Sequence, residues 1–201
     1  MKLLIAVPVT DYMHYTFTEC LLRLCRHLDM RGDAYEVKFH GGTLVHLARE
    51  DLAKYAMAGD FSHVLWLDAD MIFPETVAED LQRAGAPFVS AVYHARRPPH
   101  NSCVFLSVIP VRRPKEYPAE PFDIEGCGFG CCLMTVDVLR TVAAKHRLFL
   151  PDGYVGEDLT FCLQAKALGV RILCDPRVVC GHIGHEAVWP EGLDHGWRNA
   201  P

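Results

Sequence analysis

The sequence predicts an α/β fold: a single domain whose mixed, mostly parallel central sheet is flanked by helices. Short apolar runs of the β type alternate along the chain with amphipathic stretches of helical period, the pattern of strands joined by crossover helices. The 201 residues suit one domain with a substantial core. We expect the domain to span residues 1–184, and residues 185–201, which show no clear period, to form a tail that is either a lid or mobile.

The elements of the first half follow from hydrophobic patterning and capping signals. Apolar runs bounded by Gly, Pro or polar residues predict strands at residues 2–9, 35–39, 63–68 and 87–93. The amphipathic stretches between them predict helices at residues 16–28, 43–59 and 74–85. Thr16 and Glu19 have the spacing of a capping box, Thr43 can cap the second helix, and Pro74 suits the first turn of the third.

The second half is less regular. Residues 96–121 contain six prolines, so we expect long loops around one hairpin strand at residues 103–109. The stretch GCGFGCCLMT, residues 126–135, predicts a single strand interrupted by glycines. The remaining periodicity predicts helices at residues 136–145 and 157–168 and strands at residues 170–175 and 177–184.

Composition and charge exclude several classes of protein. Half of the residues are hydrophobic and 22% are charged, as in globular domains. The net charge of −5 argues against a protein coated in basic residues for wrapping nucleic acid. No apolar run approaches the ~20 residues of a membrane span, and Pro8 and Asp11 come too early for a signal peptide. We therefore expect a cytoplasmic protein with no transmembrane segment.

The nine cysteines are expected to be free thiols. Their number is odd, none forms a Cys-x-x-Cys pair, and most lie in apolar segments, which favours buried thiols in a reducing cytoplasm over a disulfide framework. A zinc site built from Cys127, Cys131 and Cys132 is disfavoured because adjacent cysteines point apart.

Two aspartates follow the buried strand at residues 63–68. In extended chain, residues two apart share a face, so Asp68 and Asp70 can point the same way. They lie at the carboxyl end of the strand, where open α/β sheets place their ligand crevice. A hard divalent ion with phosphate oxygens and water would balance the two charges. The alternative is that one aspartate caps a turn and the other faces solvent.

Two further signals come from the last third of the chain. Glu157 and Asp158 begin a predicted helix, where they can serve chemistry or only complement the helix dipole. His182 lies between two glycines in the last predicted strand, as a metal ligand or as a hydrogen-bonded bystander. Such residues stand at one end of each of three predicted elements, so the sequence favours one shared site.

The order of these motifs resembles that of nucleotide-sugar glycosyltransferases of the GT-A fold. The resemblance rests on Asp-x-Asp after an apolar strand, on Gly-Glu-Asp with Phe-Cys following, and on His-x-Gly in the last strand. It is closest to family two and to its small single-domain, phage-type members, and it covers the chain from IAVPV to about Gly184. It implies one Rossmann-like GT-A domain that moves a sugar from a nucleoside-diphosphate sugar, a UDP-sugar above all, to an acceptor hydroxyl.

The resemblance also implies roles for the carboxylates and the histidine. Asp68 and Asp70 match the motif that binds the metal and the diphosphate, and Asp70 matches its direct ligand. His182 matches the third metal residue, and its imidazole favours Mn²⁺ over Mg²⁺. Asp158 matches the general base and Glu157 its support or an acceptor contact, which implies a single displacement with inversion.

Donor binding is implied for Asp68 and for residues of three other segments. Arg49 matches an arginine that approaches the diphosphate, although Glu50 stands where asparagine is usual. The glycines of residues 126–130 match a segment that lines the sugar pocket, where missing side chains let the substrate approach. Their alternative is a plain turn with a bulge. The donor-binding residues so implied are Pro8, Thr10, Arg49, Asp68, Gly126 and Gly128.

A basic stretch bears on the acceptor. No acidic residue lies between Asp80 and Glu116, whereas basic residues are frequent there. Such runs can be solvated loops, or a basic rim suited to an anionic acceptor, either a glycan or a modified base in DNA. The rim would include Tyr93, Arg96, Arg97, Arg112 and Arg113.

Other classes fit the sequence less well. A sugar-1-phosphate nucleotidyltransferase needs a glycine-rich basic loop after the first strand, and residues 8–17 contain none. A dinuclear metallohydrolase needs more His and Asp ligands at strand ends. A non-catalytic module that binds a nucleotide sugar remains open.

Overall fold

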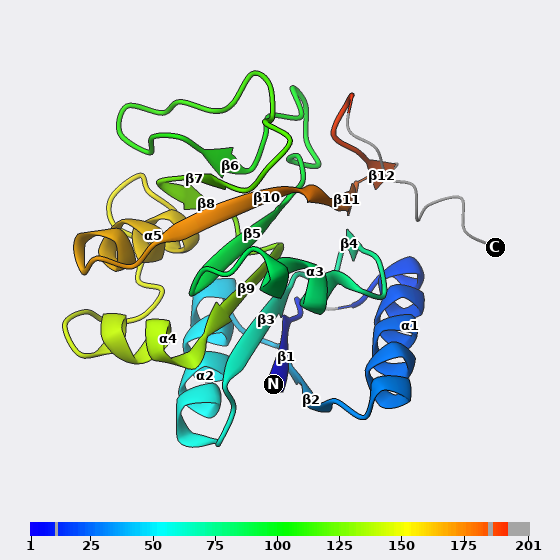
Figure 1. The fold of residues 1–201 in the computed structure, drawn as a ribbon. Helices are drawn as coiled ribbons and strands as arrows, with labels where there is room; N and C mark the ends of the chain where they lie inside the picture. The colour runs from blue at the N-terminus through cyan, green and yellow to red at the C-terminus, as the bar shows by residue number, and fades with distance from the viewer. Residues whose placement is uncertain (11, 185–186, 193–201) are drawn as a thin grey trace.

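The computed structural model describes residues 1–10, 12–184 and 187–192, and Figure 1 shows a central sheet with helices on both faces. Seven strands form the sheet in the order β2-β1-β3-β9-β5-β10-β7. Five of them run in one direction, and β9 and β7 run in the other. The strands are β1 Lys2–Pro8, β2 Ala34–His40, β3 His63–Leu67, β5 Phe88–Val92, β7 Phe122–Asp123, β9 Cys131–Thr135 and β10 Ile172–Val179.

The sheet separates two apolar layers. Along β1, Leu4 and Ala6 pack into one layer, and Leu3, Ile5 and Val7 into the other, because successive side chains of a strand point to opposite faces. The first layer lies under α2 Val45–Ala58, α4 Val136–Ala143 and α5 Glu157–Ala167. The second lies under α1 Tyr15–Arg31 and α3 Val77–Arg83. The predicted α/β class is confirmed.

Two small sheets complete the fold. One has the order β12-β11-β4, with β4 Met71–Ile72, β11 Gly181–Ile183 and β12 Ala187–Val188. The other pairs β6 Val104–Phe105 with β8 Gly126–Cys127. In the first sheet His182 lies opposite Met71, which brings the end of the chain beside the segment that follows β3.

Several element boundaries differ from the predictions. Helix α1 begins at Tyr15 and is capped by His14, whose Nδ1 accepts from the Thr16 N–H at 3.2 Å, so the capping box at Thr16 was wrong. Helix α2 is preceded by Leu44 and has no side-chain cap. Residues 126–135 form two strands, since β8 belongs to a small sheet and β9 to the central one. Residues 172–179 form one strand that continues through Pro176.

The cysteines match the prediction, since all nine are free and seven are buried. None of the helices in the described part of the chain combines the length and the apolar character that crossing a bilayer demands. The predicted tail, residues 185–201, lies outside the described residues except for residues 187–192. Within these, β12 pairs with β11.

Candidate functional site

A cleft of about 960 Å³ opens at the carboxyl ends of β1 and β3. Its walls come from the end of β1, from α2, from the turn after β3, from the loop after β5 and from the start of α5. Residues predicted from the sequence supply much of the lining: Pro8, Thr10, Arg49, Asp68, Asp70, Arg96, Arg97, Glu157 and Asp158. The structure therefore brings residues from five separate segments of the chain into one cleft.

Arg49 links the two predicted acidic pairs. Its Nη2 donates to Asp68 Oδ1 at 2.7 Å, and its Nη1 donates to Glu157 Oε1 at 2.5 Å. The guanidinium carbon lies 5.5 Å from the centre of the Phe129 ring, and only 3% of the residue is exposed. Burial works against its charge, but Asp68, Asp158 and Glu157 outweigh it and raise the pKa of Arg49. Arg49 is thus a counter-ion for the site's carboxylates and also lines the cleft, and its contact with a diphosphate stays a prediction.

Asp68 and Asp70 lie in one tight turn but have different partners. The Met71 N–H donates to the Asp68 carbonyl at 3.1 Å, and the Ile183 N–H donates to the Asp70 carbonyl at 2.8 Å. Burial raises the pKa of Asp68 although Arg49 opposes the shift. Burial works in the same direction on Asp70, but His182 and Arg96 outweigh it and lower the pKa. Asp70 is therefore ionised at neutral pH.

His182 is oriented for an ion held together with Asp70. Its Nδ1 lies 2.9 Å from the His94 carbonyl oxygen, so this nitrogen carries the proton and leaves Nε2 for a ligand. Nε2 lies 3.4 Å from Asp70 Oδ1. Burial alone would lower the pKa of His182, but the hydrogen bond and charge of Asp70 raise it. When the ring is protonated, the imidazolium and Asp70 form an ion pair.

The donor set fits a divalent ion bound by two protein ligands. A distance of 3.4 Å between Asp70 Oδ1 and His182 Nε2 suits two neighbours on one ion with bonds of about 2.0–2.2 Å. Within residues 1–10, 12–184 and 187–192, no three His, Cys, Asp or Glu side chains gather closely enough to hold an ion alone. The remaining positions would go to phosphate oxygens and water, the usual arrangement for Mg²⁺ and its relatives.

Asp158 lies in the first turn of α5, behind Gly156. Its Oδ1 accepts from the Leu159 N–H at 2.7 Å. A Cβ on Gly156 would lie 3.0 Å from that same oxygen, so the glycine leaves room for the carboxylate. Burial raises the pKa of Asp158 to about 6, with a further increase from Glu157 and an opposing effect from Arg49. At neutral pH such a carboxylate is mostly ionised, and the pH is close enough to its pKa for the group to exchange a proton.

The glycines of residues 126–130 leave room for protein atoms. A Cβ on Gly128 or Gly130 would lie 2.3 or 2.9 Å from Tyr93 Oη, and one on Gly126 would meet Leu159 and Cys162. Tyr93 is 3% exposed, and its hydroxyl accepts from the Gly130 N–H at 2.8 Å. Neither Gly126, Gly128 nor Tyr93 lines the cleft. In this structure the space beside these glycines is filled by protein atoms, and the predicted roles of the glycines in sugar binding and of Tyr93 in acceptor binding stay predictions.

The four predicted rim arginines divide into two pairs. Arg96 and Arg97 line the cleft, and Arg96 is ion-paired with Asp70. Arg113 lies over the Phe105 ring at 4.5 Å and donates to the Ser102 carbonyl at 2.8 Å, so it holds a loop to β6. Arg112 pairs through its backbone with Ser107 and, like Arg113, does not line the cleft.

Several lining residues were not predicted: Tyr12, His14, Val45, Ala69, Pro98, Ile183 and Gly184. Tyr12 and His14 lie in the segment between β1 and α1, and the carboxyl end of such a strand is itself a signal for ligand contact. Ile183 and Gly184 reach the cleft only because β11 pairs with β4, and no periodicity in the sequence indicates that pairing.

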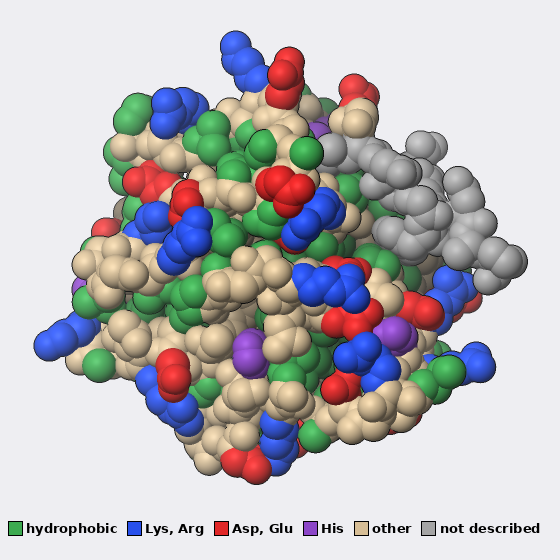
Figure 2. Space-filling view, in the orientation of Figure 1, with side chains coloured by type: hydrophobic (Ala, Val, Ile, Leu, Met, Phe, Trp, Pro, Cys, Tyr) green, Lys and Arg blue, Asp and Glu red, His purple; other side chains and the backbone are tan. Residues whose placement is uncertain are grey.

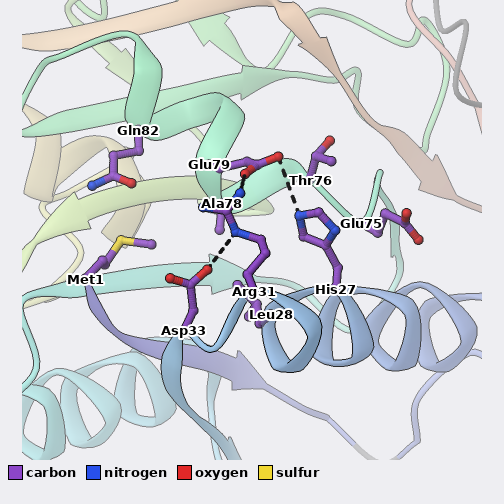
Figure 3. Close-up of a pocket in the computed structure, with 10 residues that line it drawn as sticks. All are labelled: Met1, His27, Leu28, Arg31, Asp33, Glu75, Thr76, Ala78, Glu79 and Gln82. Carbon is purple, nitrogen blue, oxygen red and sulfur yellow. Dashed lines mark hydrogen bonds and ion pairs between the residues drawn. The ribbon is translucent and has the colours of Figure 1, made fainter.

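A second hollow of about 160 Å³ lies between α1 and α3 (Figure 3). Four of its side chains are paired with one another: Arg31 with Asp33 at 2.8 Å and with Glu79 at 2.6 Å, and Glu79 with His27 at 3.5 Å. On the face seen in Figure 2, basic and acidic side chains are likewise interspersed. The hollow gathers none of the predicted site residues, so the cleft remains the candidate site.

Comparisons with known proteins bear on the fold. No family model and no curated protein sequence matches the chain. Among solved structures, A197 from STIV is similar over 97% of this chain and 96% of its own, with 18% identity and a TM-score of 0.61. GalNAc-T7, in a structure with UDP, GalNAc and Mn²⁺, is similar over 96% of this chain and 45% of its own, with 10% identity and a TM-score of 0.58.

The catalytic domain of Drosophila β1,4-galactosyltransferase 7, in complex with xylobiose, is similar over 96% of this chain and 72% of its own. The identity is 10% and the TM-score is 0.52. At such identities the likeness concerns the fold. The architecture of this chain is the GT-A fold of glycosyltransferase catalytic domains.

Proposed function

We propose that this chain is a metal-dependent glycosyltransferase that moves a sugar from a nucleoside-diphosphate sugar to an acceptor hydroxyl. The observation that carries the proposal is the cleft, in which Asp70, paired with His182, and the partly buried Asp158 face a common space of about 960 Å³. The GT-A fold supports it, as does GalNAc-T7, a fold neighbour solved with UDP and Mn²⁺. The nucleoside binds at the end of β1, at Pro8 and Thr10, with a uracil base proposed.

Asp70 and His182 hold the ion and orient the diphosphate. A carboxylate and an imidazole favour Mn²⁺, with Mg²⁺ as the alternative. When bound, the ion supplies Lewis-acid neutralisation of the charge that grows on the departing diphosphate. Arg49 holds the side chains of Asp68 and Glu157 in place through its two hydrogen bonds. Together these residues set the position of the leaving group.

Asp158 is proposed as the general base, with Glu157 in support. Its carboxylate takes the proton from the acceptor hydroxyl while that oxygen attacks the anomeric carbon opposite the leaving diphosphate. One base and no protein nucleophile give a single displacement with inversion. Arg96 and Arg97 on the cleft wall favour an anionic acceptor, with a phosphorylated glycan ahead of a hydroxylated base in DNA.

The test is a thermal-shift panel of UDP, other nucleoside diphosphates and their sugars, each with and without Mn²⁺. A ligand that binds only the folded chain raises the midpoint according to its concentration over its Kd. We expect a shift that requires metal and nucleotide together. No shift with any nucleotide would overturn the proposal, and a shift with a nucleotide sugar that is never turned over would support a binding module instead.

The pH dependence of transfer reports on Asp158. Its carboxylate faces Arg49 from α2, Glu157 from its own helix and Cys127 from β8, and its pKa is raised to about 6. Because only the ionised form accepts a proton, the transfer rate should be constant well above this pH and fall about tenfold per unit below it. Initial rates at saturating donor between pH 5 and 8 measure this. A rate that stays constant down to pH 5 would contradict the assignment.

A further inference from the structure

The loop of residues 94–102, here called the arm, touches both proposed metal ligands. It leaves the sheet after β5 and is closed by backbone hydrogen bonds, from the Ala95 N–H to the Asn101 carbonyl at 2.8 Å and from the His100 N–H to the Arg97 carbonyl at 3.0 Å. At its base the His94 carbonyl bonds His182. Farther along, the Arg96 guanidinium bonds Asp70.

Both carboxylate oxygens of Asp70 therefore already have a partner in the protein. Its Oδ1 faces His182 Nε2 at 3.4 Å, and its Oδ2 accepts from Arg96 Nη1. The Arg96 side chain is 49% exposed, whereas that of Arg49 is 4% exposed and bonded to two carboxylates. Of the two arginines, Arg96 is the one whose ion pair can open without unfolding the site.

We propose that Arg96 is an exchange cation: it neutralises Asp70 in the metal-free chain, and it binds the donor diphosphate once a divalent ion takes Asp70. This rests on the proposed function. An ion on Asp70 would lie close to the guanidinium, and like charges at such distances repel. The released guanidinium stays at the cleft wall, where the donor diphosphate on the same ion would be its nearest anion and matches the donor fork of arginine. Arg97 is then the wall arginine left for an anionic acceptor.

The arm also keeps the released Arg96 near the donor, so the exchange would affect donor binding as well as ion binding. The His94 carbonyl keeps the base of the arm at His182 whichever partner Arg96 has. Movement of the guanidinium is thus confined to the side chain and the middle of the arm. Metal occupancy and diphosphate contact are coupled through one residue.

The test compares two affinities in Arg96→Gln. Binding of Mn²⁺ alone, followed by the EPR signal of the free ion, should become about two- to fivefold tighter, because a competing cation is removed. Binding of UDP at saturating Mn²⁺, followed by calorimetry, should become about tenfold weaker, because a charge-assisted contact is lost. Arg96→Lys keeps a charge, so it should return the Mn²⁺ affinity close to that of the parent chain but restore only part of the UDP affinity.

Lys115→Gln is the matched control. Lys115 is exposed in the loop that follows β6 and does not line the cleft, so its loss lowers the net charge equally and should change neither affinity. Tighter binding of Mn²⁺ together with weaker binding of UDP in Arg96→Gln supports the exchange. If both affinities weaken in Arg96→Gln, or neither changes, the exchange is overturned. The proposed function still stands in that case as long as the wild-type chain binds Mn²⁺ and UDP. A wild-type chain that binds neither overturns both.

Discussion

Asp158→Asn is expected to lower the rate of sugar transfer by about 10²- to 10⁴-fold, the usual contribution of a general base. Donor binding should be unchanged, because Asn keeps the shape of the side chain and can still accept from the Leu159 N–H. The loss should therefore appear in kcat with little change in the KM for the nucleotide sugar. Release of nucleoside diphosphate, measured with saturating Mn²⁺, provides the readout.

Stability separates this effect from unfolding. The pKa of Asp158 is raised by folding, to about 6, so the group favours the folded chain fully at acidic pH and loses that contribution as the pH rises through 6. At pH 7 the carboxylate of the parent chain is charged in a site where burial disfavours the charge, whereas the amide is uncharged. The variant should therefore be at least as stable as the parent. Asp152→Asn, an exposed change in the preceding turn, is the control and should keep full activity. Full activity in Asp158→Asn would contradict the proposed base.

Arg49→Met is expected to lower the free energy of unfolding by about 3–5 kcal/mol, the cost of leaving a buried ion pair without one partner. Asp68 and Glu157 would lose their 2.7 and 2.5 Å hydrogen bonds, and the guanidinium's contact with the Phe129 ring would be replaced by a thioether. Urea denaturation measures the change.

Arg147→Met is the matched control, because Arg147 pairs with Glu50 at 3.2 Å but keeps 58% of its side chain exposed. Exposed pairs of this kind contribute about 0–1 kcal/mol. Adding Glu157→Gln to Arg49→Met should recover part of the loss, since one stranded charge is removed. Equal costs for Arg49→Met and Arg147→Met would show that Arg49 is not the counter-ion that holds the site together.

Much of the fold was predictable because, within each segment, the period of the apolar residues matches the side chains that the fold buries. Strand β1 is apolar on both faces, which only a layer of helices on each side can satisfy, and the helices that follow have matching apolar faces. Asp68 and Asp70 were found for the same reason: they break an apolar strand at its carboxyl end.

What escaped prediction depends on pairing between distant segments. Strand β4 has two residues, which carry no period, so its pairing with β11 was not predicted. The resemblance had placed His182 with Asp70, but this pairing is what brings the two together in the fold. The glycines of residues 126–130 were interpreted from the sequence as space for a ligand, whereas Tyr93 fills the space at Gly128 and Gly130, and Leu159 and Cys162 fill it at Gly126. Similarly, nothing in the sequence around Arg49 indicates that both of its partners are acidic residues of the site.

A crystal structure with Mn²⁺ and UDP tests the central claim most directly, because anomalous scattering locates the ion. The account predicts an anomalous peak within bonding distance of Asp70 and His182, the diphosphate on the same ion, and the nucleoside at the end of β1 near Pro8 and Thr10. An ion bound elsewhere, or UDP bound outside the cleft, would contradict it.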